Sequence, residues 1–327
     1  MGLPMHFALV ADTFYPEKNS ASVHLRDLSC QLIRVGHKVT VFVPSSGTNK
    51  STDIEWIDGI RIVRMKSFSI RDRGYLVRTL AEATMPFLMI LRCYRNSLVK
   101  ERWDGIIWYS PSIFHGPFVS FLKKKSGCKA YLIIRDIFPE WAVDIGLMSR
   151  GLPFWFFKLV AKYQYSVADV IGVQSPGNCH YFSEWQKKTC RKLEVLLSWY
   201  GKTPKVPCSI QLHTTPLAGR KIFVYAGNMG IAQGANILVK LAISMRNRPD
   251  VGFLFVGRGS CVIELKETVE REQLNHVLFF DEINADEIPD LYSQCSIGLV
   301  ALDHRHKSHN IPGKFISYIQ YGLPVLA

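Results

Sequence analysis

Short apolar runs alternate with helical patterns along the whole chain, and this rhythm predicts the elements of the fold. Runs of strand length that are almost wholly apolar are typical of parallel strands covered on both faces. In the stretch SVHLRDLSCQLIRVG, apolar residues recur every three or four positions and Gly36 ends a predicted helix. The first part of the chain contains predicted strands at 6–12, 38–44, 60–65, 105–110, 129–136, 169–175 and 193–199.

The segment 201–220 contains three prolines and little periodicity, which predicts a linker. After it the same alternation begins again, with predicted strands at 221–227, 251–257, 276–283, 296–302 and 324–327 and predicted helices at 234–247, 261–273, 286–294 and 313–321. We therefore expect an α/β protein with two Rossmann-like, doubly wound domains that face a cleft, residues 1–205 and 206–327. Because no helical pattern follows the last strand, we expect the second domain to be incomplete.

The net charge of +13 is confined to the first part of the chain. Residues 211–327 contain 11 basic and 11 acidic residues, so residues 1–210 hold 40 − 11 = 29 basic and 27 − 11 = 16 acidic residues. This asymmetry indicates an anionic partner, although a solubilising surface is the alternative. Nucleic acid is disfavoured, because no basic helix or aromatic stacking motif accompanies the charge.

No apolar run is long enough to span a membrane, and we expect no signal peptide before the first strand. The longest run, MPFLMIL (85–91), is flanked by basic residues and is suited to a membrane surface. The eight cysteines form no CxxC pair and no metal spacing, so we expect reduced thiols and no metal site.

Charged residues follow the buried strand in YLIIRDIFPEWAVDIG, namely Arg135, Asp136 and Glu140. The carboxyl end of such a strand is where an open α/β sheet places its ligand. The alternative is a structural turn in which Asp136 pairs with Arg135. Near the first strand, Ser20 and Ser22 stand at a predicted helix start, which suits either an anion site or an N-cap.

Glycine-rich turns follow two consecutive strands of the second domain. The motif YAGNMGIAQGAN offers Gly227, Asn228, Gly230 and Gln233, and FVGRGS offers Arg258. Glycines let the backbone approach a ligand closely, and a guanidinium at a strand end suits a phosphate. Alternatively, these glycines only shape the turns.

The segment DHRHKSHNIPGK (303–314) precedes a predicted helix and is strongly basic. A loop that grips a phosphate is favoured over a zinc site built from its histidines, because the histidine spacing is irregular and cations flank it. A solvated loop is the third possibility.

Taken together, these motifs resemble the retaining, nucleotide-sugar-dependent glycosyltransferases of family 4, which have the GT-B fold. The resemblance covers essentially the whole chain and rests on YAGNMGIAQGAN, FLFVGRGS, EINADEIPDLYSQCSIGLVAL and IPGKFISYIQYGLPVLA. RDIFPEWAVDIG is similar to the branch that builds O-antigen and capsule chains and includes fucosamine transferases.

The resemblance implies a nucleotide sugar, usually UDP-linked, held by the second domain without a required metal or cofactor. It also implies a lipid-linked or saccharide acceptor that meets the first domain at the inner face of the cytoplasmic membrane. Arg258 and Lys314 would stabilise the leaving diphosphate. The glycine turn would complete the donor site, to which Ser20 and Ser22 would also come close.

The same resemblance places Asp136 and Glu140 toward the sugar or the acceptor hydroxyl, as an orienting group or a base. Arg135 stands where many relatives have a histidine. His309 and Ser317 stand where many relatives have a pair of glutamates, and Ser317 can make one hydrogen bond to a ribose but not two. Two alternatives therefore stay open: a catalytically degenerate protein that binds a membrane or a complex, and a GT-B epimerase of UDP-sugars.

Overall fold

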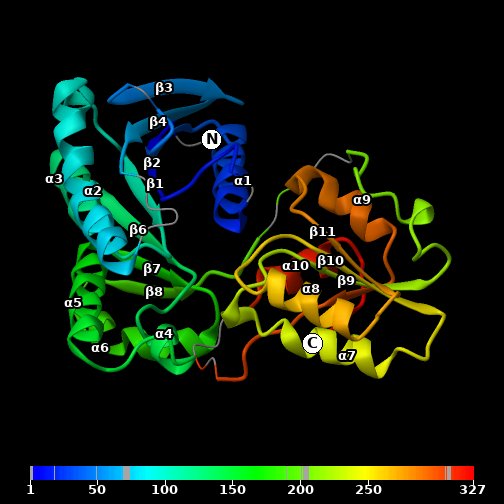
Figure 1. Cartoon of the computed structure of the whole chain (residues 1–327). Coiled ribbons are helices and arrows are strands. Elements are labelled where there is room, and N and C mark those ends of the chain that lie inside the picture. Colours follow the sequence, from blue (N-terminus) through cyan, green and yellow to red (C-terminus); the bar gives the residue numbers. More distant parts are fainter. Residues whose placement is uncertain are drawn as a thin grey trace. The chain divides into compact units, whose positions relative to one another are not determined.

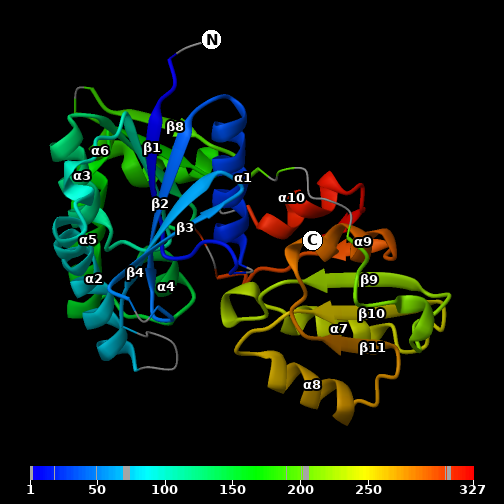
Figure 2. The same cartoon turned by 90° about the horizontal axis from the view of Figure 1, so that it is seen from above.

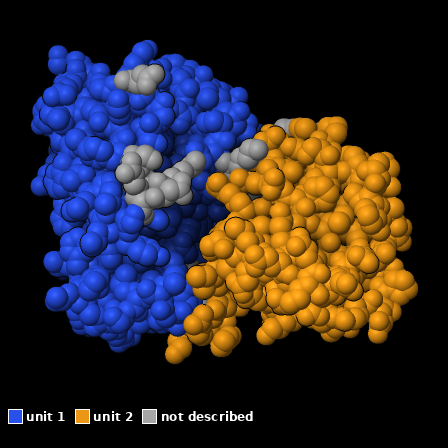
Figure 3. Space-filling model, in the orientation of Figure 1, with its two compact units in different colours: residues 1–197, 308–310 blue, residues 198–307, 311–327 orange. Residues whose placement is uncertain are grey.

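The computed structural model describes residues 3–17, 19–48, 50–68, 74–188, 190–199, 201, 206–305, 307 and 311–327. The chain divides near residue 197 into two compact units, called unit 1 and unit 2 (Figure 3). The division lies slightly before the domain boundary that the sequence predicts at residue 205. Each unit contains one sheet with helices on both faces, which confirms the predicted α/β class with two Rossmann-like sheets.

Unit 1 contains an eight-stranded sheet with the order β3-β4-β2-β1-β5-β6-β7-β8 (Figure 1). All neighbouring strands are parallel except β3 and β4. The strands are β1 (His6–Val10), β2 (Lys38–Ser45), β3 (Thr52–Ile57), β4 (Ile60–Lys66), β5 (Gly105–Tyr109), β6 (Lys129–Ile134), β7 (Val170–Val173) and β8 (Lys192–Val195).

Helix α1 covers one face of this sheet, and α2, α3 and α5 cover the other (Figures 1 and 2). The α-helices of unit 1 are α1 (Ser20–Arg34), α2 (Tyr75–Arg95), α3 (Gly116–Ser126), α4 (Glu140–Asp144), α5 (Leu152–Val167) and α6 (Ser183–Gln186). Short 3₁₀ turns are η1 (Leu98–Lys100) and η2 (Pro176–Phe182). Within the described residues, no helix combines the length and the apolar character that crossing a bilayer requires.

Strand β3 has no counterpart among the strands that the sequence predicts. It pairs antiparallel with β4 through a two-residue turn, Asp58 and Gly59, whose φ angles are 53° and 78°. Asp-Gly is a preferred sequence for this type of hairpin turn. The dipeptide Asp58–Gly59, between the apolar residues Ile57 and Ile60, is therefore a local signal for the hairpin that adds this edge strand.

Unit 2 contains a five-stranded parallel sheet with the order β11-β10-β9-β12-β13. Its strands are β9 (Lys221–Ala226), β10 (Val251–Val256), β11 (Val277–Phe280), β12 (Ile297–Leu299) and β13 (Val325–Leu326). Its helices are α7 (Asn236–Ser244), α8 (Val262–Arg271), α9 (Ile288–Ser293) and α10 (Gly313–Gln320), with 3₁₀ turns η3 (Leu212–Thr214), η4 (Ile231–Gln233) and η5 (Ala285–Glu287). The predicted strands and helices of this region all occur, with somewhat shorter bounds.

Alternate residues of the central strands of unit 2 enter two different cores. Val224 and Leu254 pack with Leu291 and Tyr318, on the side of α9 and α10. Tyr225 and the other residues of opposite parity pack on the side of α7 and α8. Both faces of each strand are therefore apolar, which explains the nearly continuous apolar runs in the sequence.

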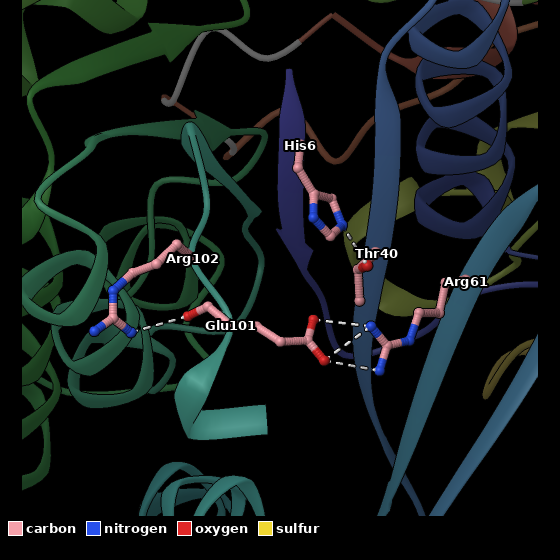
Figure 4. A network of polar contacts seen from close by, with 5 residues as sticks. All are labelled: His6, Thr40, Arg61, Glu101 and Arg102. Atoms are coloured by element: carbon pink, nitrogen blue, oxygen red, sulfur yellow. Dashed lines mark hydrogen bonds and ion pairs between the residues drawn. The ribbon is translucent and has the colours of Figure 1, made fainter. Parts of the chain in front are cut away.

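An ion pair joins α2 and its following turn to the sheet of unit 1 (Figure 4). The guanidinium of Arg61 on β4 donates hydrogen bonds of 2.8–3.0 Å to the carboxylate of Glu101, which follows η1. Nearby, His6 on β1 bonds the Thr40 hydroxyl at 2.9 Å, and burial lowers the pKa of His6. The side chains of Arg61 and Glu101 are only 18% and 29% exposed. They lie toward the amino-terminal ends of the strands, so this cluster has a structural role.

We expect Glu101→Ala to lower the free energy of unfolding by about 2 kcal/mol, because it leaves a half-buried guanidinium without its carboxylate. Urea denaturation measures this change. The matched control is Glu184→Ala, which removes a solvent-exposed partner of Lys187 and should leave the stability close to that of the wild type. Equal stability of the two variants would contradict the structural role of the Arg61–Glu101 pair.

Candidate functional site

Each sheet has a switch point, where connections leave two neighbouring strands in opposite directions. In unit 1 it lies between β1 and β5, and in unit 2 between β9 and β12. Open α/β sheets bind ligands in the crevice outside the carboxyl ends of such strands. The residues around each switch point are therefore the candidates for a site within each unit.

In unit 2, two glycine turns pack backbone against backbone after β9 and β10. Gly227 and Gly257 have φ angles of 133° and 140°, and a Cβ on Gly257 would lie 2.2 Å from the Gly227 carbonyl oxygen. The Gly227 N–H donates to Val256 O and the Met229 N–H donates to Arg258 O, both at 2.8 Å. Glycine is required here by close approach, so the turns have a structural function in addition to any role in binding.

The polar residues of the first turn bond to one another. The Gln233 Oε1 atom accepts hydrogen bonds from the Gly230 N–H and from Asn228 Nδ2, each at 3.1 Å. After this turn, the Asp303 N–H that follows β12 donates to Ala232 O at 3.1 Å. The structure thus brings Gly227, Asn228, Gly230 and Gln233 together, and it fixes their loop against the end of β12.

Lys314 reaches the same turn from the first turn of α10. A Cβ on Gly227 would lie 3.0 Å from Lys314 Cε, and the ammonium nitrogen lies 4.4 Å from the centre of the Tyr225 ring. Burial lowers the pKa of Lys314 to about 8. Within the described part of the chain, no carboxylate forms an ion pair with this ammonium. The positive end of the α10 dipole adds to its charge, so the arrangement favours an anion.

Ser317 lies one turn after Lys314 on α10 and is buried. Its neighbour Tyr318 fixes the helix, because its hydroxyl donates toward Val224 O at 3.1 Å and accepts from the Ala226 N–H at 3.3 Å. A Cβ on Gly298 of β12 would lie 2.4 Å from the Tyr318 ring. The close contact of α10 with β9 and β12 therefore positions Lys314 and Ser317.

Arg258 differs from this group. Its guanidinium forms an ion pair with Glu282 at 3.3 Å, and its side chain is largely exposed. Its backbone carbonyl accepts from the Met229 N–H, but among the contacts of the described residues none joins its side chain to Lys314 or to the Gly227 turn. The basic loop is also partly neutralised, since Asp303 accepts two hydrogen bonds from the Arg305 guanidinium and one from its N–H, and this contact lowers the pKa of Asp303.

The histidine positions of this loop bear on the zinc alternative. His306 and His309 lie outside the described residues. Among the residues that are described, no three histidine, cysteine or acidic side chains gather as metal ligands would. The prediction that no metal is required stays a prediction.

In unit 1, Arg135 follows β6 and its side chain is buried. It donates to Leu196 O at 3.1 Å, and its guanidinium carbon lies 5.9 Å from the centre of the Tyr109 ring. The Tyr109 hydroxyl bonds His24 Nδ1 at 2.9 Å. Burial, assisted by the positive charge of Arg135, lowers the pKa of His24 to about 3, so His24 is neutral at physiological pH.

The two predicted carboxylates near Arg135 have different surroundings. Asp136 is half-buried directly after β6. Glu140 begins α4, and its carboxylate forms an ion pair with Lys158 on α5. Burial lowers the pKa of Lys158. Glu140 therefore joins two helices, whereas Asp136 lies nearer to the end of the sheet.

The start of α1 corrects one sequence-based alternative. Its N-cap is Asn19, whose Oδ1 accepts from the Ser22 N–H at 2.9 Å and from the Thr13 hydroxyl at 3.1 Å. Neither Ser20 nor Ser22 caps the helix, because Asn19 is one of the strongest capping residues and stands before them. Ser20 is exposed, and the Ser22 hydroxyl is buried without a hydrogen-bond partner among the described residues.

A second polar pair lies at the switch point of unit 1 and is not among the residues that the sequence motifs predict. His115, fully buried before α3, bonds Asp12 through Nε2 at 2.9 Å. Asp12 follows β1 and His115 is in the loop after β5. Since both follow apolar strands, the rule that singled out Asp136 would also have found them.

No protein-family model matches this chain. Two curated relatives bear glycosyltransferase names. WbjE of Pseudomonas aeruginosa is 24% identical over 220 residues, which are 63% of this chain and 52% of WbjE. WcaI of Escherichia coli, named for colanic acid biosynthesis, is 22% identical over 235 residues, which are 69% of this chain and 58% of WcaI. The chain therefore spans little more than half the length of these relatives.

Solved structures share the fold over almost the whole chain. The sucrose-phosphate synthase of Thermosynechococcus elongatus superposes with a TM-score of 0.69 at 15% identity, covering 98% of this chain and 80% of the synthase. Anabaena HepE, solved with UDP and glucose, gives a TM-score of 0.65 at 16% identity and covers 99% of this chain and 80% of HepE. The fold is thus that of the GT-B glycosyltransferases.

We expect acid to destabilise unit 1 through His24. The pKa of His24 is about 3 in the folded state, against 6.5 for an ordinary histidine, so the unfolded state binds an extra proton between these values. The stability that neutral His24 contributes is present above pH 6.5 and is lost as the pH falls toward 3, by up to about 1.4 kcal/mol per pH unit. His24→Gln, which does not titrate, should show a shallower slope in urea denaturation from about pH 7 to 4. Identical slopes would contradict this origin.

Proposed function

We propose that the chain is a glycosyltransferase that moves a sugar from a nucleotide sugar to an acceptor in cell-surface polysaccharide synthesis. The names of WbjE and WcaI support this class of reaction, and the GT-B fold is consistent with it. The UDP in the HepE structure supports a UDP-linked donor. The observation that carries the proposal is the ammonium of Lys314, which lies beside Gly227 without a carboxylate partner among the described residues.

The proposed donor site is the Gly227 turn together with the start of α10. A partly desolvated ammonium is destabilised in the absence of an anion, as its lowered pKa indicates. A bound diphosphate would stabilise the charged form and raise the pKa of Lys314 again. The glycine turn lets the phosphates approach the backbone, and Ser317 is the proposed ribose contact. Arg258 is a weaker candidate, since Glu282 already neutralises it.

In the proposed reaction, the bond between the anomeric carbon and the diphosphate oxygen breaks, and a bond from the anomeric carbon to the acceptor oxygen forms. The electron pair of the broken bond leaves with the diphosphate, and the acceptor hydroxyl loses its proton. We propose retention of the anomeric configuration, as the resemblance to family 4 implies. Stabilising the leaving diphosphate is then the main requirement, and Lys314 with the α10 N-terminus would supply it without a metal.

On the acceptor side, we propose Asp136 as the group that orients or deprotonates the acceptor hydroxyl. Its neighbour Arg135 is buried and contacts Leu196 O and the Tyr109 ring, so Asp136 directly follows an anchored residue at the end of β6. Glu140 is proposed as a positioning residue, because its carboxylate is already paired with Lys158. The proposed acceptor is a lipid-linked saccharide at the inner face of the cytoplasmic membrane, in agreement with the positive charge of residues 1–210.

We expect Lys314→Met to lower the affinity for UDP at least about ten-fold, which corresponds to about 1.4 kcal/mol. Titration calorimetry with UDP measures the affinity. Because the variant removes a buried charge that lacks a carboxylate partner in the described chain, its stability should equal or exceed that of the wild type. Lys266→Met removes an exposed lysine of unit 2 and serves as the matched control. Unchanged UDP affinity in Lys314→Met would refute the proposed donor site.

We expect Asp136→Asn to reduce sugar transfer about 10²–10⁴-fold while leaving UDP affinity unchanged, because this residue acts on the acceptor. Transfer is measured from a panel of UDP-sugars to a polyprenyl-diphosphate-linked saccharide. Glu184→Gln, which changes an exposed acid of the same unit, should transfer normally. Full turnover by Asp136→Asn would reject the role of Asp136, and an epimerised donor without any transfer would reject the transferase itself.

A further inference from the structure

Helix α2 has apolar residues on two opposite faces. Its inner face packs into the core of unit 1 through Met85, Met89 and Cys93. Its outer residues recur every three, four or seven positions and are exposed; they are Leu76, Leu80, Phe87, Leu91 and Tyr94. A surface helix needs one apolar stripe to join a core. The outer stripe, in which Leu76 is 82% exposed, therefore lies largely outside the core.

Helix α5 repeats this arrangement. Phe154, Ala161 and Val167 are buried. The exposed apolar residues are Leu152, Trp155, Phe156, Leu159 and Tyr163. Leu159 is 69% exposed, and the spacing again follows the turns of the helix.

The two outer stripes belong to one side of unit 1. Helices α2, α3 and α5 cover the same face of the sheet in both views (Figures 1 and 2). Ala83 of α2 packs in one cluster with Phe157 and Val160 of α5. We call the outward apolar residues of these two helices the α2–α5 face. So many exposed apolar residues are unusual on a monomeric protein and mark an interaction surface.

Cations surround this face. The carboxyl end of α3 has three consecutive lysines, of which Lys125 lies 5.9 Å from the centre of the Tyr94 ring. Helix α5 contains two lysines and no acidic residue. On α2, burial and, to a smaller extent, the positive charge of Arg95 lower the pKa of Arg92. Among the described residues, Arg95, Lys124 and Lys162 form no ion pair.

This combination of charge and side chains decides between partners. Exposed leucine, phenylalanine and tryptophan side chains next to lysine and arginine suit the boundary between lipid headgroups and acyl chains. Anionic headgroups attract the cations, at about 1 kcal/mol per basic residue near the surface. A second copy of this chain would place the same cations against one another, which is unfavourable.

We propose that the α2–α5 face docks unit 1 onto an anionic lipid surface, with its outward apolar side chains in the headgroup region. The longest apolar run in the sequence, 85–91, contributes only Phe87 and Leu91 to this contact, because Met85 and Met89 are in the core. The inference deepens the proposed function, from which it takes the lipid-linked acceptor. The docking itself requires no nucleotide and no acceptor, so it is tested separately.

The test is co-sedimentation of the nucleotide-free protein with phosphatidylcholine vesicles, with or without phosphatidylglycerol. We expect binding to the anionic vesicles that weakens as salt is added. The double variant Phe87→Glu, Leu159→Glu should bind at least about ten-fold more weakly. Lys124→Gln and Lys162→Gln should each weaken binding about five-fold. The matched control replaces two exposed isoleucines of unit 2, Ile237→Glu and Ile263→Glu, and should bind normally.

Circular dichroism and UDP titration of the double variant show whether it remains folded. If the double variant keeps its UDP affinity but no longer binds vesicles, the result supports the docking face independently of the donor site. If UDP binds neither the wild type nor the variant, the donor proposal fails while the vesicle result still decides the docking. Equal vesicle binding by the double variant and its control would overturn the proposal. The proposal would also be overturned if the wild type formed a dimer and did not bind vesicles, while the double variant was monomeric. The partner of this face would then be a second copy of the chain.

Discussion

Helices cover both faces of the two parallel sheets, so the strands carry apolar side chains toward either side and polar groups occur at the strand ends. In unit 2, β9 and β10 divide their residues between two cores, and the first polar groups after them belong to the Gly227 and Arg258 turns. In unit 1, Asp12 and Arg135 appear at the same place after β1 and β6. The location of the candidate sites follows from this burial, whatever the chemistry of the ligand.

Compensation of charge separates structural residues from functional ones in this protein. Arg61, near the amino-terminal ends of the strands, is fully matched by Glu101, and Lys158 is matched by Glu140. Lys314 has no carboxylate partner among the described residues, and burial lowers the pKa of its ammonium. A partly buried charge without a carboxylate partner costs stability, and the proposed donor diphosphate would offset this cost. By the same reasoning, Arg258 is a weaker candidate than Lys314, because its guanidinium is already paired with Glu282.

The outer surface of unit 1 carries exposed apolar side chains, a second feature that the packing of the core does not explain. Buried apolar residues of α2 and α5 pack these helices on the sheet, whereas their exposed apolar residues lie largely outside the core. These exposed apolar side chains lie on a strongly cationic unit. A lipid headgroup layer would offer negative charge to the cations and an apolar region to the exposed side chains. Helices α2, α3 and α5 hold eight basic residues and one acidic residue, so part of the excess of +13 over residues 1–210 lies on these helices.

The sequence by itself determined the features that depend on neighbouring residues: the apolar strands, the helices of unit 2, the glycine turns and the doubly wound class. The Asp58–Gly59 hairpin was not predicted, although its signal is local, and Ser20 or Ser22 was offered as a possible cap where the structure has Asn19. The family resemblance placed Lys314 and the glycine turn in one donor site, but the contact between Lys314 and Gly227 depends on the order of β9 and β12 in the sheet, which only the tertiary structure shows. The tertiary structure likewise joined His115 to Asp12 and gave α2 and α5 a common outer face. Strand order and helix placement arise from long-range burial, which a local pattern of residues does not encode.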